Sequence, residues 1–362
     1  MLRRPFSLAV PALAWMAFGC GSSSAPRASS DAGGTPRRDA GRDSARAHDA
    51  AVDGGHDAGA SPLRDSAADS PGDASKDAIA EAGSSGPGVF VAVGYGGRRV
   101  RSLDDGVTWV DDQALEDGGG DDTDNLRTVG AWSGGFVALG WRSMTSPDAK
   151  SWTDHGTIIG NWIGSVTYAE GQLLGVGGYG LRATSTDGIT WTNHSIDTIA
   201  THPGDGLAFG AGHFVCANDN GVRTVSPDGV TWTATTGATS TLSTHLAYGN
   251  GIFLGVDGVA TVTSTDGASW TLAAPLPTAM GALVFANGTF TVIANGHVYT
   301  TPNGASWADH PVTGIAANAI AYGHGTYVLV NNTARRRSLD GITWDTAFDN
   351  GGQSLNWVAF GP

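Results

Sequence analysis

Residues 185–191 read Ser-Thr-Asp-Gly-Ile-Thr-Trp, and near copies of this stretch recur along the chain. The seven copies end on Trp109, Trp152, Trp191, Trp232, Trp270, Trp307 and Trp344, which stand 37 to 43 residues apart. They account for seven of the twelve tryptophans, so the repeat dominates the fold. A fixed period of this length is typical of a chain built from one supersecondary unit stacked on itself.

With gaps allowed, the repeated motif is Ser/Thr-x-Asp-x-Gly-x-Thr/Ser-Trp. Asp and Gly together favour a tight turn, because the carboxylate accepts main-chain N–H bonds and glycine adopts positive φ without a Cβ clash. The tryptophan offers a large apolar face for packing. We assign the acidic position to Asp105, Asp148, Asp187, Asp228, Asp266, Asn303 and Asp340. Two copies depart from the pattern, since Asn303 replaces the acid and the copy at Asp148 lacks the glycine.

This motif resembles the Asp-box (BNR) repeat of sialidases, sortilin-type receptors and photosystem assembly factors, where it joins the third and fourth strands of a propeller blade. The resemblance covers residues 88–362. Residues 207–215, Leu-Ala-Phe-Gly-Ala-Gly-His-Phe-Val, alternate on either side of a glycine turn, which predicts two β-strands before the motif. We therefore expect an all-β fold, a seven-bladed β-propeller with four-stranded blades over residues 88–362.

The two ends of the repeat region complement each other. Residues 357–361 form a first strand with no second strand after it, and residues 88–93 form a second strand with no first strand before it. Joined end to start, Phe360 and Phe90 keep the spacing that separates Phe209 from Phe214. We predict that the C-terminal strand completes the N-terminal blade and closes the ring, which removes two exposed strand edges.

Residues 1–20 predict a lipoprotein signal peptide. Arg3 and Arg4 supply positive charge, residues 6–18 are apolar but too short to span a bilayer, and Cys20 ends a stretch that resembles a bacterial lipobox. Lipid on Cys20 would anchor the protein at the bacterial outer membrane or cell surface. The alternative is an ordinary secretory signal and a periplasmic or secreted protein. Residues 21–87 lack aromatics and are rich in Asp, Ala, Gly and Ser, so we expect a disordered linker.

The charge of the repeat region limits its partners. Residues 88–362 hold 23 acidic and 11 basic residues, which argues against nucleic acid as a ligand. Seven of the acids gather in one loop, at Asp111, Asp112, Glu116, Asp117, Asp121, Asp122 and Asp124. Their spacing matches no calcium-loop motif, so we expect a solvated acidic loop and assign no metal or cofactor, with calcium as the alternative. We expect a monomer.

Aromatic residues in the turns of the first three units break the repeat. Tyr95, Trp141 and Tyr179 stand between the predicted second and third strands, and Trp162 stands before the first strand of the third unit. In a propeller these positions share one face, opposite the repeated motif. They predict a surface that stacks on sugar rings or anchors a protein loop. The alternative is that the rings fold back over the blades and only pack.

Arginine recurs three residues before the motif. The position is occupied by Arg99, Arg182, Arg223 and Arg335, and Arg142 is displaced by one place. Such guanidinium groups could clamp a carboxylate or sulfate, so Arg142 and Arg182 join the predicted ligand-binding surface. The interpretation we favour for the recurring position is a salt bridge between neighbouring blades, because repeat positions tend to serve the repeat.

We expect no catalytic residues. The repeat region holds only two glutamates, Glu116 and Glu170, and a glycosidase needs two facing carboxyl groups, which Asp205 and Asp124 or Glu116 could supply only by an accident of loop geometry. The expected function is a non-catalytic, lipid-anchored binding or scaffold propeller that recognises a glycan or a protein on one face. The alternatives are an assembly factor for a membrane protein complex and a sialidase-like glycoside hydrolase.

Overall fold

The computed structural model describes residues 88–115, 122–158, 160–195, 204–218, 222–237, 245–257, 259–278, 281–346, 348–349 and 351–362. The predicted signal peptide with Cys20 and the predicted linker lie outside these ranges, as do Glu116, Asp117 and Asp121 of the acidic loop. Among the residues that it describes, no helix is long and apolar enough to cross a membrane.

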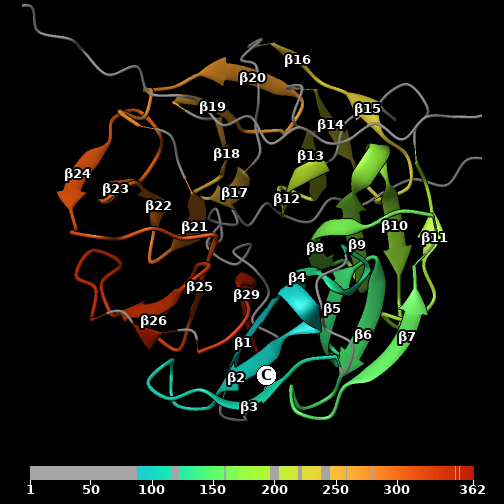
Figure 1. The fold of residues 1–362 in the computed structure, drawn as a ribbon. Coiled ribbons are helices and arrows are strands. Elements are labelled where there is room, and N and C mark those ends of the chain that lie inside the picture. Colours follow the sequence, from blue (N-terminus) through green and yellow to red (C-terminus); the bar gives the residue numbers. More distant parts are fainter. Residues whose placement is uncertain are drawn as a thin grey trace, which may run out of the picture. The chain divides into compact units, whose positions relative to one another are not determined.

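Seven antiparallel sheets form a ring, and each sheet is one blade (Figure 1). We number the blades I to VII and give their strands from the innermost outward. Blade I contains β29 (Leu355–Gly361), β1 (Val89–Gly94), β2 (Arg99–Ser102) and β3 (Val110–Gln113). Blade II contains β4 (Leu126–Trp132), β5 (Gly135–Gly140), β6 (Arg142–Ser146) and β7 (Thr153–Thr157). Blade III contains β8 (Ile163–Ala169), β9 (Gln172–Gly177), β10 (Arg182–Ser185) and β11 (Thr192–Asn193).

The remaining blades follow the same order. Blade IV contains β12 (Gly204–Gly210), β13 (His213–Asn218), β14 (Arg223–Ser226) and β15 (Thr233–Ala234). Blade V contains β17 (His245–Gly249), β18 (Ile252–Asp257), β19 (Ala260–Ser264) and β20 (Ser269–Leu272), and β16 (Thr236–Gly237) pairs in parallel with its outer edge. Blade VI contains β21 (Ala282–Ala286), β22 (Thr289–Ala294), β23 (His297–Thr301) and β24 (Ala308–Pro311). Blade VII contains β25 (Ala319–Gly323), β26 (Thr326–Val330), β27 (Ala334–Ser338) and β28 (Phe348–Asp349).

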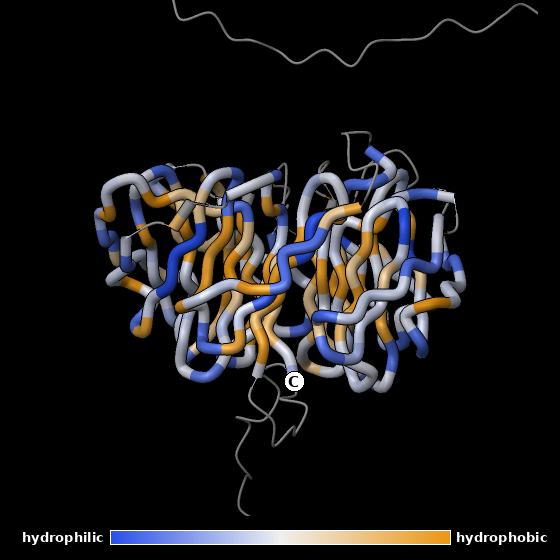
Figure 2. Tube along the Cα trace, turned by 60° about the horizontal axis from the view of Figure 1, so that its bottom comes forward, coloured by the Kyte–Doolittle hydropathy of each residue, from blue (hydrophilic) through white to orange (hydrophobic). Residues whose placement is uncertain are grey.

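The fold prediction is confirmed: the chain is an all-β, seven-bladed β-propeller. Its described helical segments are three short 3₁₀ turns, η1 (Tyr95–Gly97), η2 (Asp122–Asp124) and η3 (Gly178–Gly180). Apolar residues concentrate along the middle of the strands and polar residues in the turns at both ends, as Figure 2 shows. The hydrophobic core therefore lies between the faces of neighbouring blades.

The C-terminal strand closes the ring as predicted. β29 pairs with β1 in an antiparallel register that places Phe360 opposite Phe90. Their rings lie 4.8 Å apart at 56°, which matches the 4.7 Å and 55° between Phe209 and Phe214 inside blade IV. Blade I is thus assembled from both ends of the repeat region with the geometry of a blade made from continuous chain.

Neighbouring inner strands approach closely at glycines. A Cβ atom added at Gly210 would lie 2.0 Å from the Tyr248 ring of the next blade, and one added at Gly323 would lie 2.1 Å from the Phe360 ring. These contacts are shorter than any side chain could tolerate, so glycine is required for an aromatic ring of one blade to lie on the backbone of the preceding blade. The closing strand uses the same contact through Phe360.

The repeated motif forms a turn around its carboxylate. In blade III, Asp187 Oδ1 accepts hydrogen bonds from the main-chain N–H groups of Ile189 at 2.8 Å and Thr190 at 2.7 Å. The same pair of bonds forms at Asp148, Asp228, Asp266 and Asp340. These main-chain donors stabilise the ionised form and lower the pKa of Asp148 and Asp266 to about 2.

The assignment of Asp105 in the first copy is wrong by one residue. Asp104 accepts the turn's hydrogen bond from the Thr108 N–H at 2.8 Å and a further bond from the Ser102 hydroxyl at 2.9 Å. This copy is one residue longer than the others, and the extra residue, Asp105, adopts a left-handed φ of 57°. Because the insertion follows Asp104, this aspartate stands two residues after Ser102, as in the other copies. That spacing places the Asp104 carboxylate in the turn and leaves Asp105 outside it.

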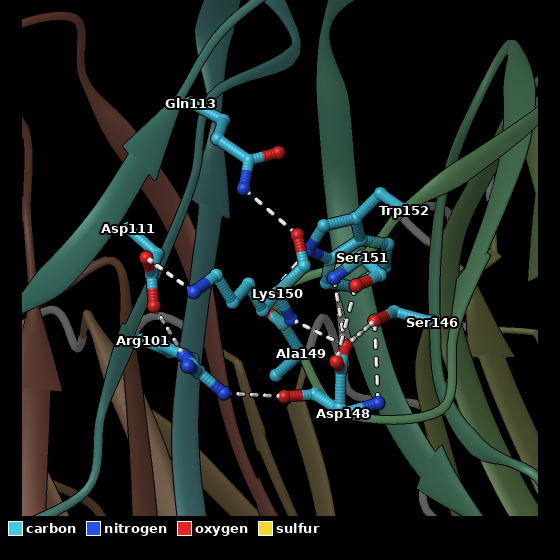
Figure 3. Close-up of polar contacts among 9 residues, drawn as sticks. All are labelled: Arg101, Asp111, Gln113, Ser146, Asp148, Ala149, Lys150, Ser151 and Trp152. Atoms are coloured by element: carbon cyan, nitrogen blue, oxygen red, sulfur yellow. Dashed lines mark hydrogen bonds and ion pairs between the residues drawn. The ribbon is translucent and has the colours of Figure 1, made fainter.

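The motif turns also tie neighbouring blades together. Figure 3 shows Arg101 of blade I donating to the main-chain oxygen of Asp148 in blade II at 2.7 Å, while its guanidinium pairs with Asp111 at 2.7 Å. Gln113 donates to the main-chain oxygen of Lys150 at 2.8 Å. The one motif without a glycine is therefore held by side chains of the preceding blade, and Ala149 keeps the left-handed conformation there with a φ of 60°.

The closing strand yields the first prediction. Deleting residues 357–362 removes most of the inner strand of blade I, exposes the edge of β1 and uncovers the face of blade VII that packs against β29. We expect the melting temperature to fall by at least roughly 10 °C, or the protein to aggregate, as calorimetry and light scattering would show. Removing Pro362 alone, which follows β29, should change little. A truncated protein that melts like the full chain would show that β29 does not hold the ring closed.

The second prediction concerns Asn303, which stands at the motif's acidic position in blade VI. Its Oδ1 accepts from the Ala305 N–H at 3.0 Å, whereas Asp187 accepts two main-chain bonds at the equivalent place. Asn303→Asp should stabilise the fold at pH 7 by on the order of 0.5–1 kcal/mol, because a charged acceptor makes stronger hydrogen bonds. Denaturant unfolding measures the change, and Asp187→Asn is the matched reverse substitution.

The pH dependence of this gain has a defined sign. The motif carboxylates have a pKa lowered below the unfolded value near 3.9, so their stabilisation is complete above about pH 4. It is lost as the pH falls towards the folded pKa near 2. The advantage of Asn303→Asp over the wild type should therefore shrink between pH 4 and about pH 2. An advantage that is independent of pH across that range would contradict this account.

Candidate functional site

The two faces of the propeller carry different turns. Because successive strands run antiparallel, the turns between second and third strands lie on the same face as the starts of the inner strands, and we call this the loop face. The motif turns join third and fourth strands and lie on the opposite face, the motif face. Gly88 precedes β1 and Pro362 follows β29, so both ends of the described chain also lie on the motif face.

The four predicted aromatic residues all lie on the loop face. Tyr95 begins η1 in blade I, Tyr179 is the middle residue of η3 in blade III, Trp141 joins β5 to β6, and Trp162 directly precedes β8. Their exposure differs. Tyr179 is 67% exposed, whereas the other three are half-buried. The four residues therefore share one face as predicted, and of the four only Tyr179 projects freely into solvent, while their role in binding stays a prediction.

Two residues connect Trp141 to Trp162, namely Asp122 of the acidic loop and Arg127 of the inner strand β4. The indole N–H of Trp141 donates to Asp122 Oδ2 at 2.8 Å, and the other oxygen of Asp122 pairs with Arg127 at 2.6 Å. The Arg127 guanidinium then lies 4.4 Å from the centre of the Trp162 ring, a cation–π distance. Trp141 and Trp162 thus belong to one chain of contacts, which fixes the orientation of Trp162.

A hollow of about 230 Å³ opens beside this network. It is lined by Asn125, Arg127, Trp162, Gly164, Asn318, Asn356 and Trp357. These residues come from the starts of the inner strands of four neighbouring blades, VII, I, II and III. We call it the central hollow. Each lining residue lies near the start of an inner strand or directly before it. The rigid blades therefore position the central hollow.

Main-chain contacts fix the asparagine side chains of the central hollow. The Asn356 amide donates to the Leu126 carbonyl at 2.9 Å and to Asn125 Oδ1 at 2.6 Å. The Asn318 amide likewise donates to the Leu355 carbonyl at 2.8 Å. A carbonyl oxygen can only accept, so the nitrogen atoms must face these oxygens. The carbonyl oxygens of Asn318 and Asn356 are left as acceptors for a ligand.

A second hollow of about 180 Å³ lies on the outer side of Trp162. It is lined by Gly160, Asn161, Gly178, Tyr179, Leu181, Asn193 and Ser195, and we call it the blade III hollow. Trp162 lines the central hollow but is not among the lining residues of the blade III hollow. A Cβ atom added at Gly178 would lie 2.7 Å from the Trp162 indole nitrogen, so the ring rests against this glycine.

The predicted ligand role of Arg182 is wrong. Arg182 is 3% exposed, and its guanidinium lies 4.8 Å from the centre of the Trp232 ring of the next blade. Arg223 stacks in the same way on Trp270, and Arg335 on Trp109. These three contacts join neighbouring blades, as the favoured interpretation of this position expects. The partner is the motif tryptophan, because a guanidinium is weakly hydrated and loses less than an ammonium when it is stacked on an indole.

Arg142 is also committed within the fold. Its guanidinium pairs with Asp124 at 2.9 Å and with Asp154. Asp124 is 5% exposed, whereas the Arg142 and Asp154 side chains stay partly exposed at 22% and 33%. The guanidinium of Arg142 is thus engaged within the fold, unlike the buried, stacked Arg182, and its role in ligand binding stays a prediction.

The acidic loop is built into the fold by arginines. Asp111, Asp112, Asp122 and Asp124 pair with Arg101, Arg98, Arg127 and Arg142 respectively. Within the ranges that the structure describes, no three His, Cys, Asp or Glu side chains gather closely enough to hold a metal ion. Glu170 lies in the turn between β8 and β9, on the motif face, away from both hollows.

Sequence analysis missed the asparagines of both hollows. Asn125 and Asn318 directly precede an inner strand, and Asn356 is the second residue of one. Asn318 and Asn356 occupy the same repeat position, four residues before Tyr322 and Phe360, and that recurrence could have revealed these two. Asn193 and Ser195 follow the outermost strand of blade III, where the repeat offers no comparable signal.

Comparisons with known proteins support the fold. AztD from Citrobacter koseri superposes with a TM-score of 0.53 at 10% identity, over 75% of this chain and 97% of that one. A chain of the mitotic checkpoint complex gives 0.53 at 11% identity, over 65% and 80%. YCF48 from Cyanidioschyzon merolae gives 0.49 at 14% identity, over 61% and 84%, which is too distant to carry an argument. At such identities the likeness shows the propeller fold alone.

No protein-family model matches the sequence, and no curated protein matches it. The fold and the loop face define the class of this protein: it is a seven-bladed β-propeller whose loop face is polar and aromatic.

Proposed function

We propose that this chain is a non-catalytic, lipid-anchored binding propeller that recognises a glycan on the loop face of blades VII, I, II and III. The observation that carries the proposal is the position of Trp162. Its ring lines the central hollow and rests against Gly178 of the blade III hollow, and Arg127 lies over its face. A fixed aromatic ring between oriented amide groups suits a ligand with both apolar C–H faces and hydroxyl groups.

The chemistry of the central hollow favours hydroxyl-bearing ligands. Asn318 and Asn356 present acceptors for O–H donors, and the one charged group in the wall, Arg127, is paired with Asp122. A ligand that supplied its own carboxylate would have to compete with Asp122 for that guanidinium. An array of neutral hydroxyl groups meets no such competition, because it needs only hydrogen bonds.

A protein partner is the second candidate, and one observation favours it. The central hollow draws residues from four blades and combines two tryptophans with an arginine, and these residue types are enriched at the centres of protein interfaces. In that case the propeller would act as an assembly factor for a membrane protein complex. Affinity capture from solubilised membranes, compared with binding to a glycan array, separates the two candidates.

The arrangement of carboxylates supports a non-catalytic role. Glycoside hydrolysis requires two carboxyl groups that face each other across the scissile bond. Neither hollow contains a carboxylate in its wall, and Asp122, the nearest acid, is engaged by Arg127 and Trp141. The hydrogen bonds of the motif turn also support kinship with the Asp-box propellers, including those that are not enzymes.

The third prediction tests the loop face. Trp162→Ala should weaken binding to glycans by at least roughly tenfold, because buried aromatic anchors commonly contribute about 2 kcal/mol or more. Titration calorimetry gives the affinity, and Trp162→Phe should retain part of it. Trp141 lines neither hollow, so Trp141→Ala should cost less and act only through Asp122.

Trp191→Ala is the stability control, because Trp191 is 4% exposed between blades III and II. It should cost roughly 3–5 kcal/mol in unfolding free energy and reduce binding only through unfolding. A Trp162→Ala protein that unfolds as Trp191→Ala does would make Trp162 a packing residue. One that stays folded and binds normally would move the site elsewhere.

The fourth prediction concerns attachment. If Cys20 is lipidated, mass spectrometry of the mature N-terminus should find acyl groups on that residue. Cys20→Ser should leave the precursor uncleaved by the lipoprotein signal peptidase and should release the protein from the membrane fraction if another peptidase acts. Cleavage elsewhere, with Cys20 unmodified, would point to a periplasmic or secreted protein.

A further inference from the structure

The backbone at Tyr179 is in a conformation that side chains other than glycine seldom adopt. Its φ of 52° and ψ of 37° are left-handed, and Gly96 takes the equivalent place in blade I with a φ of 67° and a ψ of 23°. For a residue with a Cβ atom this region is strained, because the Cβ lies too close to the following carbonyl oxygen. Blade III therefore carries an aromatic residue where the fold of the same turn accommodates glycine.

Packing does not explain why Tyr179 is there. The residue is 67% exposed, so its ring recovers little of the free energy that burial of an aromatic side chain supplies. No described residue forms a hydrogen bond to its hydroxyl. A strained residue that gains little from packing within the fold points to a role outside it.

The hollow beside Tyr179 is neutral. Its walls consist of glycine, asparagine, serine, leucine and tyrosine, in a domain whose surface is strongly acidic. At about 180 Å³ it is smaller than the roughly 300–1,000 Å³ of pockets that hold drug-sized ligands. It therefore suits a single small ring, and an uncharged one, because none of its described lining residues carries a charge.

Two amide groups in the hollow have fixed directions. Asn161 Oδ1 accepts from the Trp162 main-chain N–H at 3.0 Å, and Asn193 Oδ1 accepts from the Ser195 main-chain N–H at 2.8 Å. A main-chain N–H can only donate, so each side-chain oxygen must face it. The side-chain nitrogens are left as donors, and no described residue accepts a bond from either. The hollow thus offers two oriented N–H donors beside an exposed ring.

We propose that Tyr179 and the blade III hollow form a subsite for one neutral pyranose ring of the glycan. The C–H face of the sugar lies on the tyrosine ring, and the amides of Asn161 and Asn193 donate to its hydroxyl oxygens. This inference rests on the proposed glycan-binding function. Trp162 lines the central hollow and rests against Gly178 of the blade III hollow, so the subsite extends the central site by one sugar unit.

The test uses the full-length protein and neutral oligosaccharides of glucose, mannose or N-acetylglucosamine, one to six rings long. Oligogalacturonates of the same lengths are the acidic counterpart. Tyr179→Gly should match or exceed the melting temperature of the wild type, because glycine relieves the left-handed strain. Its affinity for the best neutral oligosaccharide should fall at least tenfold. Tyr179→Phe keeps the ring and should bind within about threefold of the wild type.

The outcomes separate this inference from the proposed function. Normal binding by Tyr179→Gly, together with loss of binding by Trp162→Ala, overturns the subsite and leaves the glycan function standing. A clear drop in melting temperature for Tyr179→Gly overturns the subsite as well, because the ring would then be structural. Wild-type binding to oligogalacturonates alone overturns the neutral-sugar assignment, and no binding to any sugar overturns both proposals.

Discussion

The packing of an aromatic ring on a glycine of the preceding blade is the contact on which the ring of blades depends. It appears where Tyr248 lies on Gly210 and Phe285 on Gly249, inside continuous chain, and again where Phe360 lies on Gly323 at the junction of the two ends. A propeller has no central core to hold it, so each blade is stable only between two neighbours. The closing strand must therefore reproduce this internal contact, and it does.

The candidate site inherits this dependence. Asn356 and Trp357 of the central hollow belong to β29, the strand that closes the ring, while the opposite walls come from β4 and β8. The hollow is complete only when the last strand is in place. Binding and closure should thus stabilise each other, since a ligand that contacts β29 and β8 together favours the closed form.

The features of the fold that the repeat determines could be predicted from the sequence. The blade count, the split blade and the face that carries the aromatic turns all follow from the spacing of the repeat, and that spacing is set by the geometry of blade stacking. The sequence did not reveal side-chain partners across blades, which are far apart in sequence. Arg182 looked like a ligand clamp because nothing local shows that Trp232 lies over it. Asp105 was chosen over Asp104 because an inserted residue leaves two adjacent acids, and only the turn's hydrogen bonds distinguish them.

The placement of the chain ends on the motif face has a mechanical consequence. If the residues before Gly88 tether the protein to a surface, a ligand held on the loop face pulls from the other end of the same strands. The force then runs along β1, which is paired with β29 on one side and β2 on the other. Both ladders are loaded in shear, so their hydrogen bonds resist together instead of opening one by one. A propeller attached in this way can hold its ligand under tension.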